Sequence, residues 1–262
     1  MKLEMTTFYK YQGTGNDFVI IDDREEQFDI SNQPLIKKLC DRKFGIGADG
    51  LMLLRNKSGF DFEMVYFNSD GRVSSMCGNG GRCIVAFAHF LGVIKEKCHF
   101  IAIDGPHDAT INQGIVSLQM QNVDKIQQLE EGIFMDTGSP HVVNFLTNNV
   151  KEIDLVPEAR AIRYNERFEA EGTNVNFAHV EAGEIQARTY ERGVEDETLS
   201  CGTGVTAIAL AAHQQGLLDQ SEIAINTSGG QLKVSFTPNE KGYTNIWLTG
   251  PATFVFKGEI EV

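Results

Sequence analysis

Short runs of β-forming residues recur along the chain and predict that it folds mainly as β-sheet. Several runs alternate apolar and polar side chains, as strands with one buried face do, and others are apolar throughout. The predicted strands are residues 18–21, 50–54, 60–67, 115–118, 185–190 and 232–236. A helix is predicted at residues 34–42.

Two stretches of the chain repeat one another and predict a central helix in each half. CGNGGRCIVAFAHFLGVI begins at Cys77 and CGTGVTAIALAAHQQGLL begins at Cys201, and seven of the eighteen positions are identical without a gap. The identical pairs are Cys77/Cys201, Gly78/Gly202, Gly80/Gly204, Ile84/Ile208, Ala88/Ala212, His89/His213 and Gly92/Gly216. Each copy is a glycine-rich turn followed by a helix of about 12 residues that a late glycine ends. Because these helices have few polar residues on any face, we expect them to be buried.

These elements predict an α+β fold of two pseudo-symmetric halves, each a curved mixed sheet around one central helix. Residues 1–125 form the N-terminal half, which carries Cys77, and residues 126–250 form the C-terminal half, which carries Cys201. A last apolar run at residues 252–256 is predicted to return and pair with the first half. Residues 251–262 are therefore assigned to the N-terminal half.

Charge and hydropathy limit the possible partners. The 262 residues carry a formal net charge of −13 and contain no run of lysine or arginine. Because such a surface repels phosphate backbones, nucleic acid is not an expected partner. No apolar run approaches the roughly 20 residues of a membrane span, and the N-terminus lacks the apolar segment of a secretory signal. We therefore expect a cytoplasmic protein without a membrane partner.

The five cysteines form neither a disulfide framework nor a zinc motif. Their number is odd, their spacing is wide and no C-x-x-C pair occurs, whereas both kinds of site need paired cysteines at short or regular spacing. We therefore predict no metal site. Cys40, Cys83 and Cys98 are interpreted as buried thiols without a chemical role.

One glycine motif matches a nucleotide-binding pattern but has the wrong neighbours. Residues 45–50 read G-x-G-x-x-G, which binds a dinucleotide when a strand precedes it and a helix follows. Here a predicted helix precedes and a predicted strand follows. The motif is therefore interpreted as a tight turn, and no cofactor site is predicted.

The two Cys-Gly-x-Gly turns carry the candidate chemistry. A cysteine at a helix entry lies at the positive end of the helix dipole, which lowers its pKa, and the first N–H groups of the helix can bind a carboxylate. Two such turns predict one carboxylate held between two thiols. Inverting an α-carbon without a cofactor needs two such groups, one to remove a proton from one face and one to deliver a proton to the other. Cys77 and Cys201 are the predicted pair.

Further short motifs are spread along the whole chain. Those of the first half are GTGNDF (13–18), GIGAD (45–49), FNSDG (67–71) and MCGNGGR (76–82). Those of the second half are GSPH (138–141), TNVNF (173–177), YERG (190–193) and SCGTG (200–204). With these motifs the chain resembles the diaminopimelate epimerase family almost from end to end. The resemblance implies the diaminopimelate epimerase-like fold of two barrel-like halves, commonly as a homodimer. It also implies interconversion of LL- and meso-diaminopimelate in lysine and peptidoglycan precursor biosynthesis, without pyridoxal phosphate or metal.

The resemblance further implies roles for single residues. Cys77 and Cys201 are the base and acid, with Cys77 facing the α-proton of the LL substrate. His141 and Glu191 are implied to modulate the pKa values of the thiols, and Glu191 to accept the ammonium group at the reacting carbon. The residues implied to bind substrate are Asn16, Asn68, Gly78, Asn79, Asn174, Glu191, Arg192, Gly202 and Thr203. Of these, the backbone at Gly78, Asn79, Gly202 and Thr203 holds the reacting carboxylate, and Asn16, Asn68, Asn174 and Arg192 chiefly recognise the distal amino-acid end.

Two positions depart from the pattern of many family members, which carry glutamine where this chain has Gly50 and asparagine where it has Ser139. Both changes concern the distal contacts and leave the cysteine pair untouched. The alternatives are a two-cysteine racemase of the same fold acting on proline, hydroxyproline or histidine, an isomerase of the branch that lacks the thiols, and a non-catalytic binder of amino dicarboxylates. Asn79, where proline-type enzymes are expected to have histidine, argues against the first, and the two thiols argue against the others.

Overall fold

The chain divides into two compact units in the computed structural model, which describes residues 5–261. Unit 1 comprises Met1–Leu118 and Pro251–Val262, and unit 2 comprises Gln119–Gly250. The division falls after Leu118 and not at the expected residue 125. The reason is that the next residues already pair within unit 2, where the Met120 N–H donates to the Ile246 carbonyl and the Val123 N–H to the Tyr243 carbonyl.

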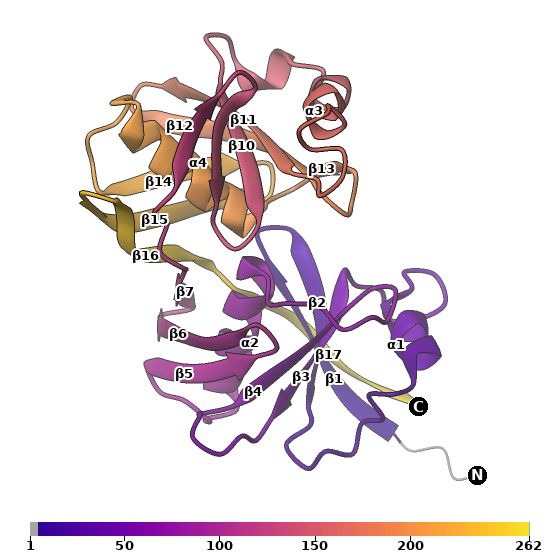
Figure 1. Ribbon diagram of the computed structural model, residues 1–262. Coiled ribbons are helices and arrows are strands. Elements are labelled where there is room, and N and C mark those ends of the chain that lie inside the picture. The colour runs from indigo at the N-terminus through magenta and orange to yellow at the C-terminus, as the bar shows by residue number, and fades with distance from the viewer. Residues whose placement is uncertain (1–4, 262) are drawn as a thin grey trace. The chain divides into compact units, whose positions relative to one another are not determined.

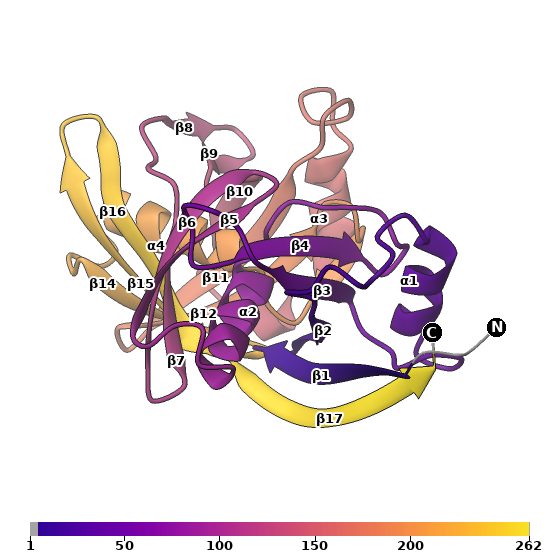
Figure 2. The same cartoon turned by 90° about the horizontal axis from the view of Figure 1, so that it is seen from below.

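Unit 1 is a mixed sheet in the order β17–β1–β2–β3–β4–β5–β6–β7, in which β17 lies beside β1 (Figure 2). The strands are β1 (Met5–Gly13), β2 (Asn16–Asp22), β3 (Gly50–Arg55), β4 (Glu63–Asn68), β5 (Lys97–Ala102), β6 (Gly105–Asn112), β7 (Ile115–Gln119) and β17 (Thr253–Glu261). Only the β2–β3 and β4–β5 pairs are parallel. Each parallel pair is joined by a helix, α1 (Gln33–Cys40) for the first and α2 (Gly78–Phe90) for the second, because a parallel connection must cross the sheet.

Unit 2 repeats this arrangement in the order β8–β9–β10–β11–β12–β14–β15–β16. The strands are β8 (Ile126–Leu129), β9 (Gly132–Asp136), β10 (Pro140–Phe145), β11 (Asn174–Glu181), β12 (Glu184–Glu191), β14 (Glu222–Thr227), β15 (Gly230–Asn239) and β16 (Gly242–Pro251). The parallel pairs are again the third and the fifth, β10–β11 and β12–β14. A short 3-10 helix, η1 (Val150–Glu152), and helix α3 (Leu155–Arg163) join the first pair, and β13 (Asp196–Thr198) and helix α4 (Gly202–Gln214) join the second. The predicted α+β fold of two similar halves, each a mixed sheet with a central helix, is confirmed.

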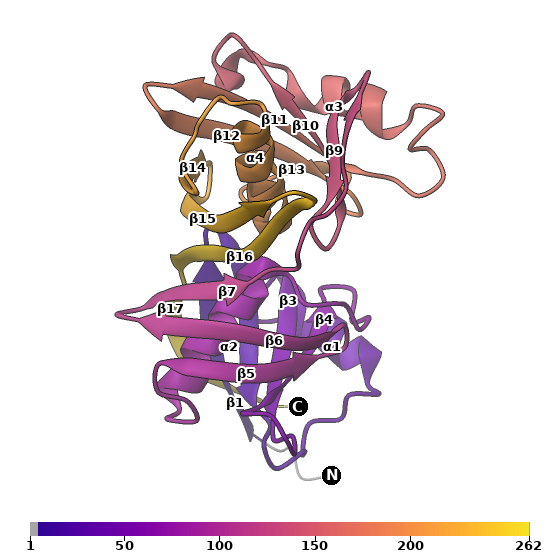
Figure 3. The same ribbon diagram turned by 60° about the vertical axis from the view of Figure 1, so that its left-hand side comes forward.

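The central helix of each unit is enclosed by its sheet. In unit 1, α2 packs against β1, β2, β3 and β6, and the strands β5, β6 and β7 run across it (Figure 3). In unit 2, α4 packs against strands from β9 to β15. The smaller helices α1 and α3 cover the opposite faces of the strands they join (Figure 1). Strands β2 and β3 are therefore buried on both faces, which explains why both are apolar without alternation.

The two central helices begin and end alike. Each spans 13 residues and starts directly after its repeat cysteine. Two residues after the last helical residue, each has a glycine in the left-handed region, Gly92 with φ 71° and Gly216 with φ 65°. The following N–H groups bond back into the helix, from Val93 to the Ala88 carbonyl and from Leu217 to the Ala212 carbonyl, both at 3.0 Å. This is the glycine-dependent helix stop that the sequence predicted.

Two predicted elements extend beyond the observed ones by two or more residues at one end. The helix predicted at residues 34–42 ends at Cys40, because Asp41 has extended backbone and its carboxylate accepts hydrogen bonds from the N–H groups of Lys43 and Phe44. The strand predicted at residues 60–67 begins at Glu63, because the Phe60 N–H closes a turn onto the Lys57 carbonyl. Of the helices between residues 5 and 261, none has the length and apolar character that a membrane crossing requires.

Candidate functional site

Cys77 lies at the entrance of α2, as its N-cap residue. Its Sγ accepts a hydrogen bond from the Gly80 N–H at 3.2 Å. A Cβ atom at Gly80 would lie 3.2 Å from this sulfur and 3.3 Å from Met52 Sδ, so glycine lets the sulfur approach the helix backbone. The helix dipole and the N–H donor both place positive charge beside the sulfur, and both therefore favour the thiolate.

Cys201 has the equivalent position at the entrance of α4 and is buried. Its carbonyl accepts the Val205 N–H at 2.9 Å, and its Sγ lies 3.4 Å from the hydroxyl of Thr203. The backbone of Thr203 is held in place by a hydrogen bond, which the Thr137 hydroxyl donates to the Thr203 carbonyl at 2.9 Å. The repeat therefore places both predicted cysteines at helix N-termini, one in each unit.

A buried chain of polar side chains reaches Thr203 from the sheet of unit 2. The Nε2 atom of His141 lies 2.9 Å from Thr203 Oγ1, and its Nδ1 atom lies 3.1 Å from Asn176 Nδ2. Asn176 Oδ1 accepts the Thr189 hydroxyl at 2.9 Å. His141 is fully buried, and this burial together with the positive charge of Arg192 lowers the pKa of His141 to about 3. The ring is therefore neutral at physiological pH.

Asn174 organises the turn that carries Arg192. Its Nδ2 donates to Ser139 Oγ at 2.8 Å and to the Pro140 carbonyl at 2.9 Å, and its Oδ1 accepts the Arg192 N–H at 2.8 Å. The Arg192 guanidinium donates to the Glu171 carbonyl at 2.9 Å. Ser139, one of the two departures from the family pattern, therefore bonds directly to a predicted substrate-binding residue.

Glu191 is the last residue of strand β12. Its Oε2 accepts the Thr198 hydroxyl at 2.9 Å, and its side chain is half-buried. On β12 alternate residues face the same way, so Glu191 and Thr189 lie on the face of the strand that carries the polar chain.

The other departure, Gly50, is explained by a neighbouring ring. A Cβ atom at this position would lie 2.5 Å from Tyr66 Cε2 and 2.6 Å from the Phe67 carbonyl oxygen. The ring of Tyr66 therefore occupies the space that a longer side chain at position 50 would need. A glutamine at this position cannot be accommodated unless both the Tyr66 ring and the Phe67 backbone move.

Two of the three predicted asparagines of unit 1 lie at strand ends, Asn16 at the start of β2 and Asn68 at the end of β4. Asn16 Oδ1 is buried and has no hydrogen-bond partner among the described residues. The backbone of Asp49 ties the two ends together, since its N–H donates to the Asp17 carbonyl at 2.9 Å and its carbonyl accepts the Ser69 N–H at 3.1 Å. Their backbone positions therefore depend on Asp49.

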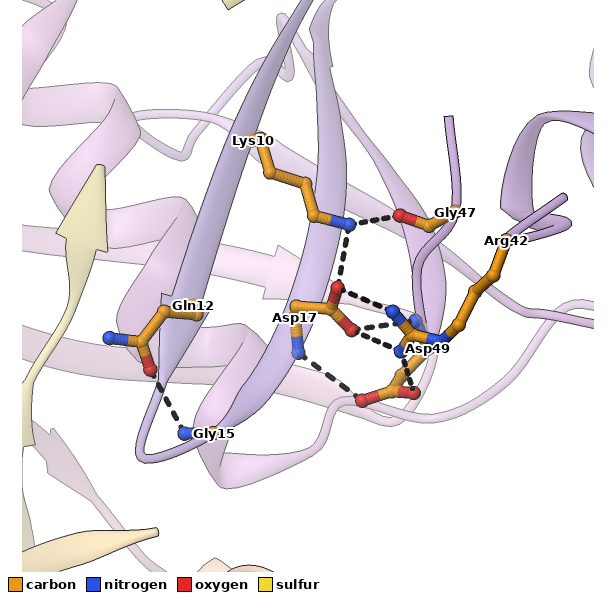
Figure 4. Close-up of polar contacts among 7 residues, drawn as sticks. All are labelled: Lys10, Gln12, Gly15, Asp17, Arg42, Gly47 and Asp49. Atoms are coloured by element: carbon orange, nitrogen blue, oxygen red, sulfur yellow. Dashed lines mark hydrogen bonds and ion pairs between the residues drawn. The ribbon is translucent and has the colours of Figure 1, made fainter. Parts of the chain in front are cut away.

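A network of charges holds Asp17 and Asp49 in place (Figure 4). Lys10 Nζ lies 2.7 Å from Asp17 Oδ2 and also bonds the Gly47 carbonyl. Arg42 grips the Asp17 carboxylate at 3.0 and 2.6 Å and reaches Asp49 Oδ1 at 2.8 Å. Burial alone would raise the pKa of Asp17, but the hydrogen bonds from Arg42 and Lys10 outweigh it and hold the pKa well below its usual range. Burial and the charge of Asp17 raise the pKa of Asp49.

Replacing Asp17 with asparagine is expected to lower the free energy of unfolding by about 3 kcal/mol at pH 7, because the buried Lys10 then loses its counter-charge. The folded-state pKa of Asp17 lies below the unfolded value, so its stabilisation is present above about pH 4 and disappears as the pH falls through the folded pKa. Urea unfolding at pH 7 and pH 3 should therefore show a smaller difference at pH 3. Asp219→Asn, at an exposed position, is the control, and an equal difference at both pH values would contradict the role of the charge.

Arg82 is a buried residue of the Cys77 turn that was not among the predicted site residues. It is fully buried, its hydrogen-bond partners within residues 5–261 include no carboxylate, and burial lowers its pKa. Its guanidinium donates to the Gly78 carbonyl at 3.1 Å, to Asn79 Oδ1 at 3.1 Å and to Thr14 Oγ1 at 3.2 Å. It thereby fixes the turn that carries Gly78 and Asn79 against the β1–β2 turn.

The structure thus gathers the predicted residues in two sets. Unit 1 brings Cys77, Gly78 and Asn79 together with Thr14 and Arg82. Unit 2 brings Cys201 and Thr203 together with His141, and Asn174 together with Arg192. Asn176 was not among the predicted residues, although strand alternation from Asn174 could have indicated it. Within residues 5–261, no group of three or more His, Cys, Asp or Glu side chains is arranged to hold a metal ion.

Solved structures with this fold cover almost the whole chain. A phenazine biosynthesis protein of the PhzF family from Bacillus anthracis has a TM-score of 0.78 and 12% identity, and the match covers 99% of this chain and 100% of that protein. A hydroxyproline epimerase from Agrobacterium vitis has a TM-score of 0.68 and 14% identity, with 98% of this chain and 93% of that protein covered. The chain therefore has the fold that these proteins share.

Sequence comparison identifies the family within this fold. The diaminopimelate epimerase family model matches residues 8–126 and 133–255. The diaminopimelate epimerase of Flavobacterium psychrophilum is 54% identical over 254 residues, which cover 96% of this chain and 99% of that protein. That of Aquifex aeolicus is 39% identical, with 97% of each chain covered. The chain belongs to the diaminopimelate epimerase family.

Proposed function

We propose that this protein interconverts LL- and meso-diaminopimelate by proton transfer at one α-carbon, with Cys77 and Cys201 as the two acid–base groups. The observation that carries the proposal is the repeated geometry of the thiols. This protein belongs to the diaminopimelate epimerase family, and each of its two units has one cysteine at the N-terminus of its central helix. Supply of diaminopimelate for lysine and peptidoglycan precursors is the role that this activity implies.

The proposed reaction requires one thiolate to remove the α-proton while the other group, as a thiol, delivers a proton to the opposite face. The carbanion that forms is far more basic than a thiolate, so electrostatic stabilisation must lower most of the barrier. The N–H groups of Gly78 and Asn79, and those of Gly202 and Thr203, belong to first helical turns, whose amides have no carbonyl partner within the helix. We assign them to the reacting carboxylate, whose charge grows as the proton leaves.

The distal end of diaminopimelate carries a second carboxylate and ammonium group. We assign its recognition to Arg192 and to Asn16, Asn68 and Asn174, because a guanidinium grips a carboxylate through paired N–H groups and an amide can serve either charge. The buried Oδ1 of Asn16 supports this assignment, because an ammonium group would supply the hydrogen bond that it lacks. Glu191 is assigned to the ammonium group at the reacting carbon.

Solvent exchange tests the proposed function. The protein is incubated with LL-diaminopimelate in deuterium oxide without added cofactor, and deuterium at the α-carbons is followed by NMR together with the LL-to-meso ratio. Incorporation coupled to inversion is the expected result. Absence of exchange and inversion would reject diaminopimelate as the substrate.

The same assay separates the alternatives. The hydroxyproline epimerase of similar fold has trans-4-hydroxy-L-proline bound, so proline, hydroxyproline and histidine are tested in parallel. Exchange with one of these and none with diaminopimelate would indicate another racemase. Calorimetric binding of diaminopimelate without exchange would indicate a non-catalytic binder.

We further propose that the protein is a homodimer that uses an aromatic patch on unit 1. The patch consists of Phe90, Phe254, Val255 and Phe256, which are between 43% and 59% exposed. Phe90 and Phe254 stack with centroids 6.2 Å apart. Three of these residues belong to strand β17. Among the described strands of unit 1, β17 pairs only with β1, so β17 is an edge strand of that sheet. An apolar patch on an edge strand favours association with a second copy about a two-fold axis.

Replacing Val255 with aspartate is expected to weaken the dimer at least about 100-fold, because association would then bury an unpaired carboxylate. Sedimentation velocity over a range of protein concentrations measures the change. Ile103→Asp is the matched control, because Ile103 is an exposed apolar residue of the same unit outside the patch. An unchanged dimer in Val255→Asp, or a monomeric wild-type protein at all concentrations, would reject this interface.

A further inference from the structure

The direction of the hydrogen bonds in the polar chain of unit 2 can be assigned from its fixed ends. Asn176 is fully buried, and its Nδ2 lies 3.0 Å from the Val142 carbonyl oxygen. A carbonyl oxygen only accepts hydrogen bonds, so the amide group facing it must be the NH₂. The Oδ1 atom then faces Thr189, whose hydroxyl donates to it at 2.9 Å.

This orientation determines the tautomer of His141. The second hydrogen of Asn176 Nδ2 points to His141 Nδ1 at 3.1 Å, so Nδ1 accepts and carries no hydrogen. Because burial keeps the ring neutral, its hydrogen is on Nε2. Asn174 Nδ2 also lies 3.4 Å from Nε2, but its two hydrogens are used by Ser139 Oγ and the Pro140 carbonyl. The Nε2 hydrogen therefore goes to Thr203 Oγ1, 2.9 Å away.

The last link points to the sulfur. Since Thr203 Oγ1 accepts from His141, its own hydrogen is available to a further acceptor, and Cys201 Sγ lies 3.4 Å away. We propose that the Thr203 hydroxyl donates to Cys201 Sγ, and that Asn176 and Thr189 are positioning residues that hold His141 in the tautomer that directs this bond, so that Cys201 is stabilised as a thiolate. A hydrogen bond given to a charged form favours that form.

Few charged side chains lie near the hydrogen-bonded side chains that lead from Thr189 to Cys201. On β10, β11 and β12, His141, Asn176 and Thr189 lie against the first turn of α4, and Glu191 lies on the same face of β12 as Thr189. Glu191 is thus the acidic group on this face, and it opposes the thiolate. Arg192 follows it, and burial together with the positive charge of Arg192 lowers the pKa of His141. The proposed hydrogen bond acts in the same direction as the helix dipole of α4 and against Glu191.

Unit 1 has apolar side chains at the positions that correspond to His141 and Asn176. His141 pairs with Asn174 across β10–β11 as Phe18 pairs with Gly50 across β2–β3. Phe18 therefore corresponds to His141, and Met52, two residues beyond Gly50, corresponds to Asn176. The polar side chains that lead to Cys201 are therefore not repeated at these two positions of unit 1. The surroundings of Cys77 and Cys201 differ in this respect.

Thiol titration tests this inference. It rests on the proposed role of Cys201 as an acid–base group, but the measurement uses no turnover. The rate of Cys201 alkylation by iodoacetamide is followed against pH by peptide mass spectrometry. A Cys77→Ala background removes the other thiol of the proposed pair. Thr203→Val and Asn176→Leu are each expected to raise the apparent pKa of Cys201 by about one pH unit, and Thr203→Ser to restore it.

Thr206→Val is the matched control, since the Thr206 hydroxyl bonds to the Gly202 carbonyl at 3.0 Å and lies outside the polar chain. An unchanged Cys201 titration in Thr203→Val would overturn the proposal. A shift in Thr203→Val without one in Asn176→Leu would reject the positioning role. If Asn176→Leu does not fold, Thr189→Val takes its place, with a smaller shift expected in the same direction. Failure of solvent exchange in the wild-type protein would reject the proposed function and leave the titration result standing.

Discussion

Replacement of either Cys77 or Cys201 with alanine is expected to lower the rate of inversion by roughly 10⁴-fold, the upper range for loss of a general acid or base. Inversion needs a proton removed from one face and a proton delivered to the other. A single remaining thiol therefore cannot complete it. The two variants should lose inversion to a similar extent despite the different surroundings of the two thiols. The LL-to-meso ratio and α-deuterium content measured in deuterium oxide report this loss.

Cys98→Ala is the control for these variants. Cys98 lies buried in β5, and burial raises the pKa of its thiol to about 12, so it is protonated at neutral pH and should be dispensable for inversion. Folding of all three variants is compared by thermal unfolding. Retained inversion in Cys77→Ala or Cys201→Ala would contradict the two-thiol mechanism, whereas loss in Cys98→Ala with intact folding would show that the assay does not isolate the pair.

Replacement of Arg82 with methionine is expected to lower the free energy of unfolding by about 3 kcal/mol and to reduce activity as well. Methionine fills a similar volume but leaves the Gly78 carbonyl, Asn79 Oδ1 and Thr14 Oγ1 without their buried donor. A buried acceptor that loses its partner destabilises by about 1–3 kcal/mol. The loss here is limited because the Thr14 hydroxyl lies 3.4 Å from Asn79 Oδ1 and can serve it.

The activity of Arg82→Met should fall because the Gly78–Asn79 turn is then free to shift. A misplaced donor stabilises the developing carboxylate charge less well. Urea unfolding and the deuterium assay measure the two effects. Arg72→Met is the control, since the Arg72 side chain is 78% exposed. Wild-type stability in Arg82→Met would show that the buried guanidinium contributes nothing net.

Much of the fold follows from local patterns. The apolar runs of β2 and β3, the alternation along β12 and the glycines that end α2 and α4 act over a few residues, so their elements are readable without tertiary information. The internal repeat predicted the division into two halves, because two similar stretches of sequence are expected to form two similar units. The bounds at Asp41 and Phe60 were misjudged because hydrogen bonds of a side chain and a turn decide them.

Less of the candidate site could be predicted, and the reason is the distance along the chain between its members. Asn176 is 35 residues from His141, and Thr203 is 62 residues from it. No local pattern relates such residues. The contact between position 50 and the ring of Tyr66 is also non-local, since a Cβ atom at Gly50 would lie 2.5 Å from Tyr66 Cε2.

By itself, the sequence determined that the protein has two similar α+β halves, each with a cysteine at the entrance of a buried helix, and it indicated the family through motifs spread along the whole chain. Tertiary structure alone decided that Arg82 is buried beneath the first of these turns and that a directed polar chain runs from Thr189 to the second. The physical reason is that periodicity and turn chemistry are local, whereas burial and hydrogen-bond direction depend on residues that only the folded sheet brings together.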